Sequence, residues 1–314
     1  MDGKIVENWR GVFMEKLKYS FFVLAGAISY GLLSTAIKLG MENGFTVNEL
    51  VGGQYLFGWL GLFIVVLISS KFRISKKLLF SLLLAGIPMS LTGITYGFAV
   101  KELSASIAII FLFQFTWIGV IIEAIANKKF PGKDKWLSIA VLFIGTLFAG
   151  GIFDGISLAY SLSGILFGLL AAISFALNIF FNSRIATKVP AYTKSFYMTS
   201  GATIVICSVF PPTFLTSGAL QGGLWKYGVF LGLFGVVLPV ICFSIGTPKV
   251  GAGLGTILSS VELPVVAVSS IIFLQETVSR LQWVGIFLIL VGIIVPNAYV
   301  IMRKREQQQV TNAT

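Results

Sequence analysis

Long apolar segments make up most of this chain, and short polar stretches rich in lysine and arginine separate them. An apolar segment of about twenty residues crosses the hydrocarbon core of a bilayer as one α-helix. The pattern therefore predicts an all-α integral membrane protein with ten transmembrane helices. The predicted spans are Leu17–Leu39, Val47–Ser70, Leu78–Val100, Ser104–Ala126, Trp136–Ile152, Leu162–Asn182, Tyr192–Phe210, Trp225–Thr247, Val250–Leu274 and Leu281–Met302.

The composition supports a membrane protein and narrows its chemistry. Only 11% of the 314 residues are charged, whereas 56% are hydrophobic, a balance that no soluble domain keeps. The net charge of +11 lies in short loops between apolar segments, so it indicates topology and does not predict a nucleic-acid partner. The chain contains no histidine, the commonest general base and transition-metal ligand, and no ATP-binding loop. We therefore expect no metal and no cofactor.

The basic residues also predict the orientation in the membrane. Lysines and arginines gather before the first span, after the second, fourth, sixth and eighth spans, and after the tenth. Because basic loops stay on the cytoplasmic side, both termini are expected in the cytoplasm of a multi-pass plasma-membrane protein, in a bacterium the cytoplasmic membrane. Segment 1–16 would then be a cytoplasmic N-terminal segment, and 303–314 a disordered cytoplasmic tail.

An internal repeat divides the chain into two halves. At an offset of 147 residues, Trp136 aligns with Trp283 and Gly145 with Gly292. The repeat predicts one five-helix unit over 17–152 and a second over 153–302. Because five spans are an odd number, the second unit enters the membrane from the opposite side. This inverted-topology repeat is typical of secondary transporters.

Glu262 is the strongest candidate for a functional residue. It lies in the middle of the ninth predicted span, two residues before Pro264. An ionisable group at mid-membrane is costly, so by default it faces a cavity and serves function. The alternative is a structural carboxylate that bonds a neighbouring helix. Burial would disfavour the charged form, which would let Glu262 exchange a proton for substrate or pair with a cationic group on it.

Other polar residues lie at similar depth, and inverted repeats place the substrate near the midplane between the halves. Gln114 and Trp117 lie beside Phe115, which is the repeat partner of Glu262. Each residue equally suits an ordinary contact between helices. The candidates for substrate binding are Glu262, Gln114, Trp117, Asn178, Tyr30 and Tyr96. Ser34 and Asn182 could line the cavity as well, and Gln54 and Tyr55 are weaker candidates.

Three more residues are candidates for gating or coupling, together with Glu262. Glu123 lies near the cytoplasmic end of the fourth span, where neighbouring lysines would keep it charged at little cost. Pro88 lies inside the third predicted span and Pro239 inside the eighth, and these two spans correspond under the internal repeat. Each proline leaves a backbone carbonyl of its helix without a hydrogen bond. Flexed helices around a cavity suit alternating access, although static kinks are equally compatible with the sequence.

The second half resembles the EamA type of the drug/metabolite transporter superfamily. The resemblance rests on Glu262-Leu263-Pro264, on Gln275-Glu276 and on Gln282-Trp283-Val284-Gly285, and it extends over Leu17–Met302. Lys129 occupies the repeat position of Glu276, so we expect Glu276 mainly to cap its helix. The resemblance implies a secondary carrier for small metabolites, often an exporter of amino acids or related compounds.

The residues and the resemblance together predict a secondary active transporter, not an enzyme. It would move a small polar metabolite by alternating access through a cavity between the first, third, fourth, sixth, eighth and ninth spans, with protons as a possible coupling ion. A sugar or nucleotide-sugar carrier is the main alternative, and a passive channel or a membrane-embedded enzyme is weaker. A monomer and a homodimer are both compatible with the glycine-rich faces.

Overall fold

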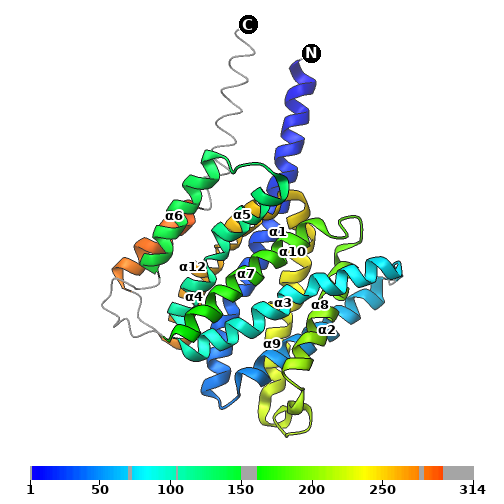
Figure 1. Cartoon of the computed structure of the whole chain (residues 1–314), viewed down its shortest axis with the longest axis vertical. Coiled ribbons are helices and arrows are strands. Elements are labelled where there is room, and N and C mark those ends of the chain that lie inside the picture. Colours follow the sequence, from blue (N-terminus) through cyan, green and yellow to red (C-terminus); the bar gives the residue numbers. More distant parts are fainter. Residues whose placement is uncertain (1, 70–72, 104, 150–160, 276–278, 293–314) are drawn as a thin grey trace.

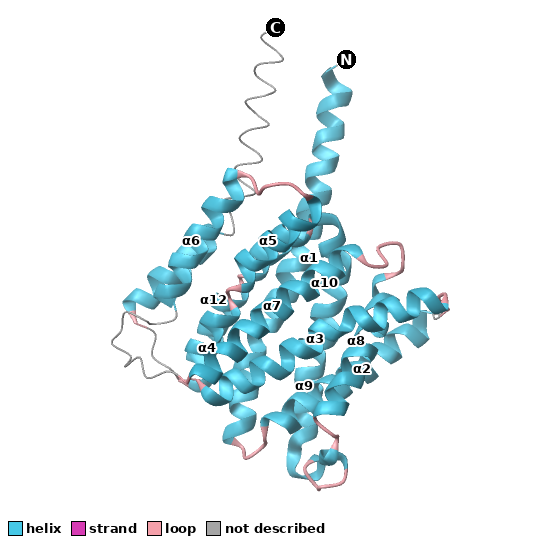
Figure 2. Ribbon diagram, in the orientation of Figure 1, coloured by secondary structure: helices cyan, strands magenta, loops and turns pink. Residues whose placement is uncertain are grey.

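The computed structural model describes residues 2–69, 73–103, 105–149, 161–275 and 279–292. Within these ranges the regular elements are all helical, and short loops join them into a bundle (Figures 1 and 2). The 303–314 tail and Glu276 lie outside the described residues. The elements of the first half are α1 (Asp2–Glu42), α2 (Val47–Ser69), α3 (Lys76–Glu102), α4 (Ala105–Leu112), α5 (Phe115–Asn127) and α6 (Lys133–Ala149).

The second half repeats this order with one span interrupted by π-helical turns. It continues to a short apolar helix over Arg280–Gly292. Its other elements are α7 (Leu162–Arg184), α8 (Ala191–Val209), η2 (Thr213–Leu215), η3 (Leu220–Leu224), α9 (Trp225–Gly232), η4 (Leu233–Val237), α10 (Leu238–Val250), α11 (Ala252–Ser259) and α12 (Glu262–Leu274).

Seven helical stretches in the described residues are long and apolar enough to cross a membrane. They correspond to the first four, the sixth, the eighth and the ninth predicted spans. The three remaining spans fall on α6, on α8 and on the Arg280–Gly292 helix. Two of those three are apolar helices of fewer than eighteen described residues, and α8, with 19 residues, is long enough but is not among the seven sufficiently apolar stretches. The chain is therefore a multi-pass helical membrane protein.

The fourth and ninth spans are each broken at equivalent positions. An offset of 147 residues carries α4 onto α11 and α5 onto α12, with both bounds of each helix coinciding. The same offset pairs the two C-caps, Lys128 and Gln275, which both adopt the left-handed conformation. The sequence repeat thus has a counterpart in local structure, including a helix break midway along each mate.

The two halves approach each other most closely where glycines remove side chains. A Cβ atom on Gly86 in α3 would lie 1.9 Å from the main-chain oxygen of Met198 in α8. A Cβ on Gly201 in α8 would lie 2.1 Å from the main-chain oxygen of Leu83. Similar contacts join Gly145 of α6 to Gly285 of the last helix. At these crossings two backbones pack directly against each other, because glycine has no side chain to hold them apart.

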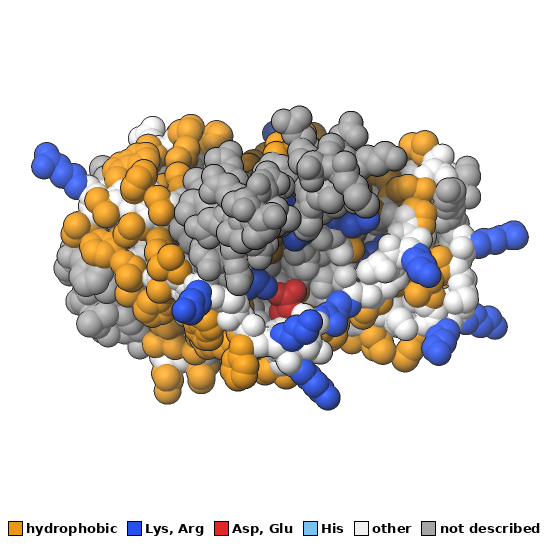
Figure 3. All heavy atoms as spheres, turned by 90° about the horizontal axis from the view of Figure 1, so that it is seen from above, with side chains coloured by type: hydrophobic (Ala, Val, Ile, Leu, Met, Phe, Trp, Pro, Cys, Tyr) orange, Lys and Arg blue, Asp and Glu red, His pale blue; other side chains and the backbone are white. Residues whose placement is uncertain are grey.

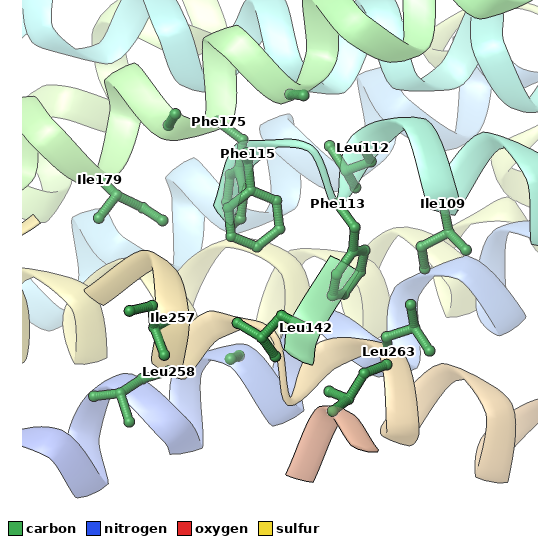
Figure 4. Close-up of a cluster of buried hydrophobic side chains, with 14 of the residues drawn as sticks. Ile109, Leu112, Phe113, Phe115, Leu142, Phe175, Ile179, Ile257, Leu258 and Leu263 are labelled. Atoms are coloured by element: carbon green, nitrogen blue, oxygen red, sulfur yellow. The ribbon is translucent and has the colours of Figure 1, made fainter. Parts of the chain in front are cut away.

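An apolar core fills the space between α1, α5, α7, α11 and α12. Figure 4 shows its larger side chains, with Phe115 of α5 and Phe175 of α7 directed toward each other. Their rings meet edge to face at a centroid separation of 4.7 Å. This arrangement is favourable for aromatic pairs, and it ties one mated helix of the first half to the second half.

Charge separates the two ends of the bundle. We call the end that carries Lys128, Arg184 and Lys249 the basic end, and the end that carries Glu42 and Glu102 the opposite end. Figure 3 looks onto the basic end and shows lysine and arginine side chains distributed over this face. This is the asymmetry that the loop composition predicts.

Candidate functional site

A cavity of about 100 Å³ lies within the bundle and extends to the opposite end. A volume of this size holds several water molecules or a small solute. Its walls come from α1, α2, α3 and α7, with one residue each from α4, η4 and α12. The lining residues are Tyr30, Leu33, Ser34, Ile37, Lys38, Val47, Val51, Gln54, Tyr55, Met89, Thr92, Gly93, Tyr96, Gly97, Val100, Leu112, Phe175, Asn178, Gly235 and Glu262.

Glu262 occupies the inner part of this cavity, at the first residue of α12. Its side chain is 7% exposed, and its Oε2 atom has no hydrogen-bond partner among the described residues. The break between α11 and α12 places the carboxylate at a helix N-terminus, where the helix dipole favours negative charge. A broken helix that presents its terminus to a cavity is a recurring way to bind solutes within a bilayer.

Gly31 in α1 allows the first turn of α12 to come close. A Cβ atom at this position would lie 2.8 Å from the main-chain oxygen of Glu262 and 2.6 Å from the Val265 side chain. Because real Cβ atoms do not make contacts this short, only glycine fits here without a shift. The local sequence of α1 therefore helps to fix the position of Glu262.

Few polar side chains accompany Glu262, and the remaining lining is mainly apolar. Asn178 of α7 is 7% exposed, and no described residue forms a hydrogen bond with its side chain. The Tyr96 hydroxyl lies 3.4 Å from Ser34 Oγ, and the Tyr55 hydroxyl donates to the Met89 main-chain oxygen at 2.7 Å. An apolar pocket with a few convergent polar groups is typical of small-molecule sites.

Aromatic rings pack against one another beside the cavity. Tyr30 lies 5.7 Å from Phe175 and 5.8 Å from Phe243 between ring centroids. Phe175 also packs on Phe115, which is the repeat partner of Glu262. The sequence predicts a cavity between six helices; all six contribute to the lining, and α2 contributes as well.

The structure does not place Gln114 and Trp117 in this lining. Gln114 donates from Nε2 to the Ile110 main-chain oxygen at 3.0 Å and accepts at Oε1 from the Trp117 ring nitrogen at 2.7 Å. Both side chains thus use these polar atoms within the broken α4–α5 segment. Tyr30, Tyr96, Asn178 and Glu262, in contrast, come together around one cavity.

Glu123 lies near the basic end, away from the cavity. Its Oε2 accepts from Lys135 Nζ at 2.7 Å, and the carboxylate lies against Gly251 and Gly253 at the start of α11. A side chain on Gly253 would meet this carboxylate at 2.2 Å. The ion pair therefore joins α5 and α6 of the first half to the N-terminus of α11, where negative charge is favourable.

The two candidate prolines occupy different positions in their helices. Pro88 lies inside α3, where it provides no N–H, and Thr92 Oγ1 donates to its oxygen at 2.8 Å. Pro239 lies in the first turn of α10, directly after the π-helical η4. Both prolines therefore lie inside spanning helices, and Pro239 directly follows the π-helical turns of its span.

Several lining residues gave no distinctive signal in the sequence. Leu33, Val51, Met89 and Leu112 line the cavity but read as ordinary core or lipid-facing residues of apolar spans. An apolar span has apolar side chains on every face, so its sequence does not show which face points inward. That choice depends on the helices that pack against it. Lys38 was visible only as a charge at the outer end of its span.

The fold and the cavity define the class of the protein as a multi-pass membrane protein with a solute-sized internal site. The model of the EamA-like transporter family matches residues 17–151 and 162–297. The chain belongs to the EamA-like transporter family.

Two Bacillus subtilis (strain 168) proteins are similar over most of the chain. The uncharacterized transporter YwfM is 24% identical over 289 residues, 89% of this chain and 94% of that protein. The uncharacterized transporter YdfC is 25% identical over 273 residues, 84% of this chain and 86% of that protein. One crystal structure, 16% identical, superimposes with a TM-score of 0.70 over 90% of this chain and 98% of its own, which supports the fold.

The family and these relatives indicate membrane transport rather than catalysis. A transporter of this kind works in a lipid bilayer on a small-molecule substrate. In the described residues, no cluster of three or more histidine, cysteine, aspartate or glutamate side chains could hold a metal ion. The groups at the site suit the binding of a solute: one buried carboxylate, two side-chain amides and three tyrosines line a mainly apolar cavity.

Proposed function

We propose that the protein is a secondary carrier that moves a small polar metabolite by alternating access, and that Glu262 is the charged group of its substrate site. One observation carries the proposal. Glu262 lines a solute-sized cavity at a helix break, and one buried oxygen of its carboxylate has no hydrogen-bond partner among the described residues. A buried charge costs free energy unless it is paired or neutralised, so a cationic group or a proton is its natural partner.

The repeat supports the alternating-access part of this proposal. Two five-helix units of inverted topology, with both termini in the cytoplasm, would place the basic end at the cytoplasmic face. The coincident breaks in α4–α5 and α11–α12 are the local structure expected of such mates. The cavity then belongs to an outward-facing state, and the Glu123–Lys135 pair would help to close the cytoplasmic side. Export of an amino acid or related compound fits the family resemblance.

The test is transport by the purified protein in liposomes, with an aliphatic amine, an amino acid and a sugar as separate solutes. We expect flux of a solute with a cationic group, accompanied by proton movement that a trapped pH dye reports. Glu262→Gln should lower that flux at least about tenfold, since it removes the charge but keeps the shape. Glu42→Gln, at an exposed position, is the matched control. Wild-type flux and proton movement in Glu262→Gln would refute a role for Glu262.

A sugar or nucleotide-sugar carrier is the second candidate. Three tyrosines, Tyr30, Tyr55 and Tyr96, line the same cavity and offer aromatic faces and hydroxyls to a sugar ring. In this case, sugar flux should survive Glu262→Gln better than it survives Tyr96→Ala. Competition between the three solutes in one liposome preparation separates the two candidates.

A further inference from the structure

A second buried charge lies outside the cavity, in the first turns of α8. The Lys194 side chain is 1% exposed, and Nζ donates to the main-chain oxygen of Asn182 in the last turn of α7. In the described residues, no carboxylate pairs with this lysine. A cation at a helix C-terminus is favourable, but an exposed lysine does this equally well. Complete burial without a counter-ion costs several kcal/mol and needs another explanation.

Buried polar side chains lie on α8 within two turns of Lys194 and on segments of α7 and α10 that bond to this part of α8, and two of them have no hydrogen-bond partner among the described residues. Asn182 Oδ1 is buried without a hydrogen bond from any described residue, and so is Thr199 Oγ1 on α8. Ser195 Oγ donates to Ser244 Oγ of α10 at 3.0 Å, and both side chains are buried. We call these five residues the Lys194 cluster. Buried polar atoms are usually paired, so unpaired ones point to a bound ligand or to water.

The position of the Lys194 cluster follows the internal repeat. The cavity reaches the opposite end beside Ile37 and Lys38 in the last turns of α1 and Val47 at the start of α2. The mates of these segments are the last turn of α7 and the first turns of α8, where Asn182 and Lys194 lie. Inverted halves exchange roles when a carrier changes access. The cluster therefore occupies the place where the second half would open.

The Lys194 cluster is also connected to the cavity through α7. Asn178, which lines the cavity beside Glu262, precedes Asn182 by one helical turn on the same face of α7. The helix α10, which carries Ser244, packs against both α7 and α8. A solute that leaves Asn178 toward the basic end would meet Asn182 and then Lys194.

We propose that the Lys194 cluster is the closed cytoplasmic half of the transport pathway, and that Lys194 binds an oxyanion group of the solute when this half opens. The proposal rests on the proposed function, because only a carrier that alternates access needs a second opening to its cavity from the cytoplasmic side. In this proposal α7, α8 and α10 line the pathway when it opens to the cytoplasm, as α1, α2 and α3 line the cavity in the present state.

Cysteine accessibility tests the opening. In a Cys207→Ala, Cys242→Ala background, Ser195→Cys should react with a membrane-impermeant thiol reagent in inverted vesicles, although the side chain is buried in the present state. Ala202→Cys, equally buried on α8 but packed in the apolar core, is the control and should stay unreactive. Ser34→Cys, in the cavity lining, should react in right-side-out vesicles.

Reagent charge tests the role of Lys194. A sulfonate-bearing methanethiosulfonate should modify Ser195→Cys about tenfold faster than its trimethylammonium analogue, after correction for their rates with a free thiol. Lys194→Met should remove this preference, and Lys194→Arg should keep it. A lysine that merely caps α7 predicts no preference for the anionic reagent.

The outcomes are distinct. If Ser195→Cys never reacts while Ser34→Cys does, the inference is wrong and the carrier proposal stands. Reaction of Ser195→Cys without charge preference overturns the oxyanion role of Lys194. If Ser34→Cys fails to react from outside, the outward-facing cavity itself is wrong, and both proposals fail together.

Discussion

The crossing of α3 and α8 at Gly86 offers a direct test of how the two halves are held together. Substitution of alanine would place a Cβ atom 1.9 Å from the main-chain oxygen of Met198. A backbone oxygen cannot rotate away as a side chain can, so the helices must separate by about 1 Å to restore even a tight contact. Overpacking of this kind costs typically about 1–3 kcal/mol.

Gly53→Ala in α2 provides the matched control. It is the same substitution inside a buried part of a helix, but there the added Cβ would lie 3.7 Å from Gly228 Cα, an ordinary contact. Alanine is favoured over glycine within a helix by about 1 kcal/mol, so this variant should be unchanged or more stable. Gly86→Ala gains the same helix preference and should still lose stability.

Thermal unfolding of the purified proteins in one detergent measures the difference. We expect a lower midpoint for Gly86→Ala than for wild type, and an equal or higher midpoint for Gly53→Ala. Separation of α3 from α8 should also disturb the cavity, because Met89 and Thr92 on α3 line it one turn further on. Equal stability of the two alanine variants would refute the close crossing.

Three further predictions concern single contacts. Gly119→Ala should destabilise the crossing of α5 and α11, where its Cβ would lie 2.2 Å from Thr256 Cγ2, and Thr256→Ser should partly rescue it by removing that methyl group; a double-mutant cycle in unfolding experiments measures the rescue. Tyr55→Phe should lower the unfolding free energy by about 1 kcal/mol, the contribution of its lost hydrogen bond. A cycle between Glu123 and Lys135 should give a coupling of up to about 1 kcal/mol that added salt weakens, since both side chains keep some exposure.

The sequence predicts the broad architecture well, because its signals are local. Apolar segments of sufficient length predict helices, and the internal repeat predicts corresponding elements in each half. The helix breaks before Phe115 and Glu262 coincide under the offset found from tryptophans and glycines alone. The family that matches the chain is the one indicated by the Glu262-Leu263-Pro264 and Gln282-to-Gly285 motifs.

The candidate site was only partly predictable. A lone intramembrane carboxylate is conspicuous at any position, so Glu262 could be named from its cost in a bilayer. Gln114 and Trp117 have the same depth and polarity as true lining residues, but they bond each other within their own span. Lys194 drew attention only as a loop charge, and its burial became visible with the packing of α7 against it.

The sequence by itself determined that this chain enters a membrane as helices and that it is built from two related halves, and it predicted that the Glu262 carboxylate lies within the bilayer. These are properties of single segments and of their comparison. Only the tertiary structure decided which face of each helix turns inward, because an apolar helix carries no marked face of its own. The close glycine crossings set those rotations, and with them the cavity beside Glu262 and the buried cluster around Lys194.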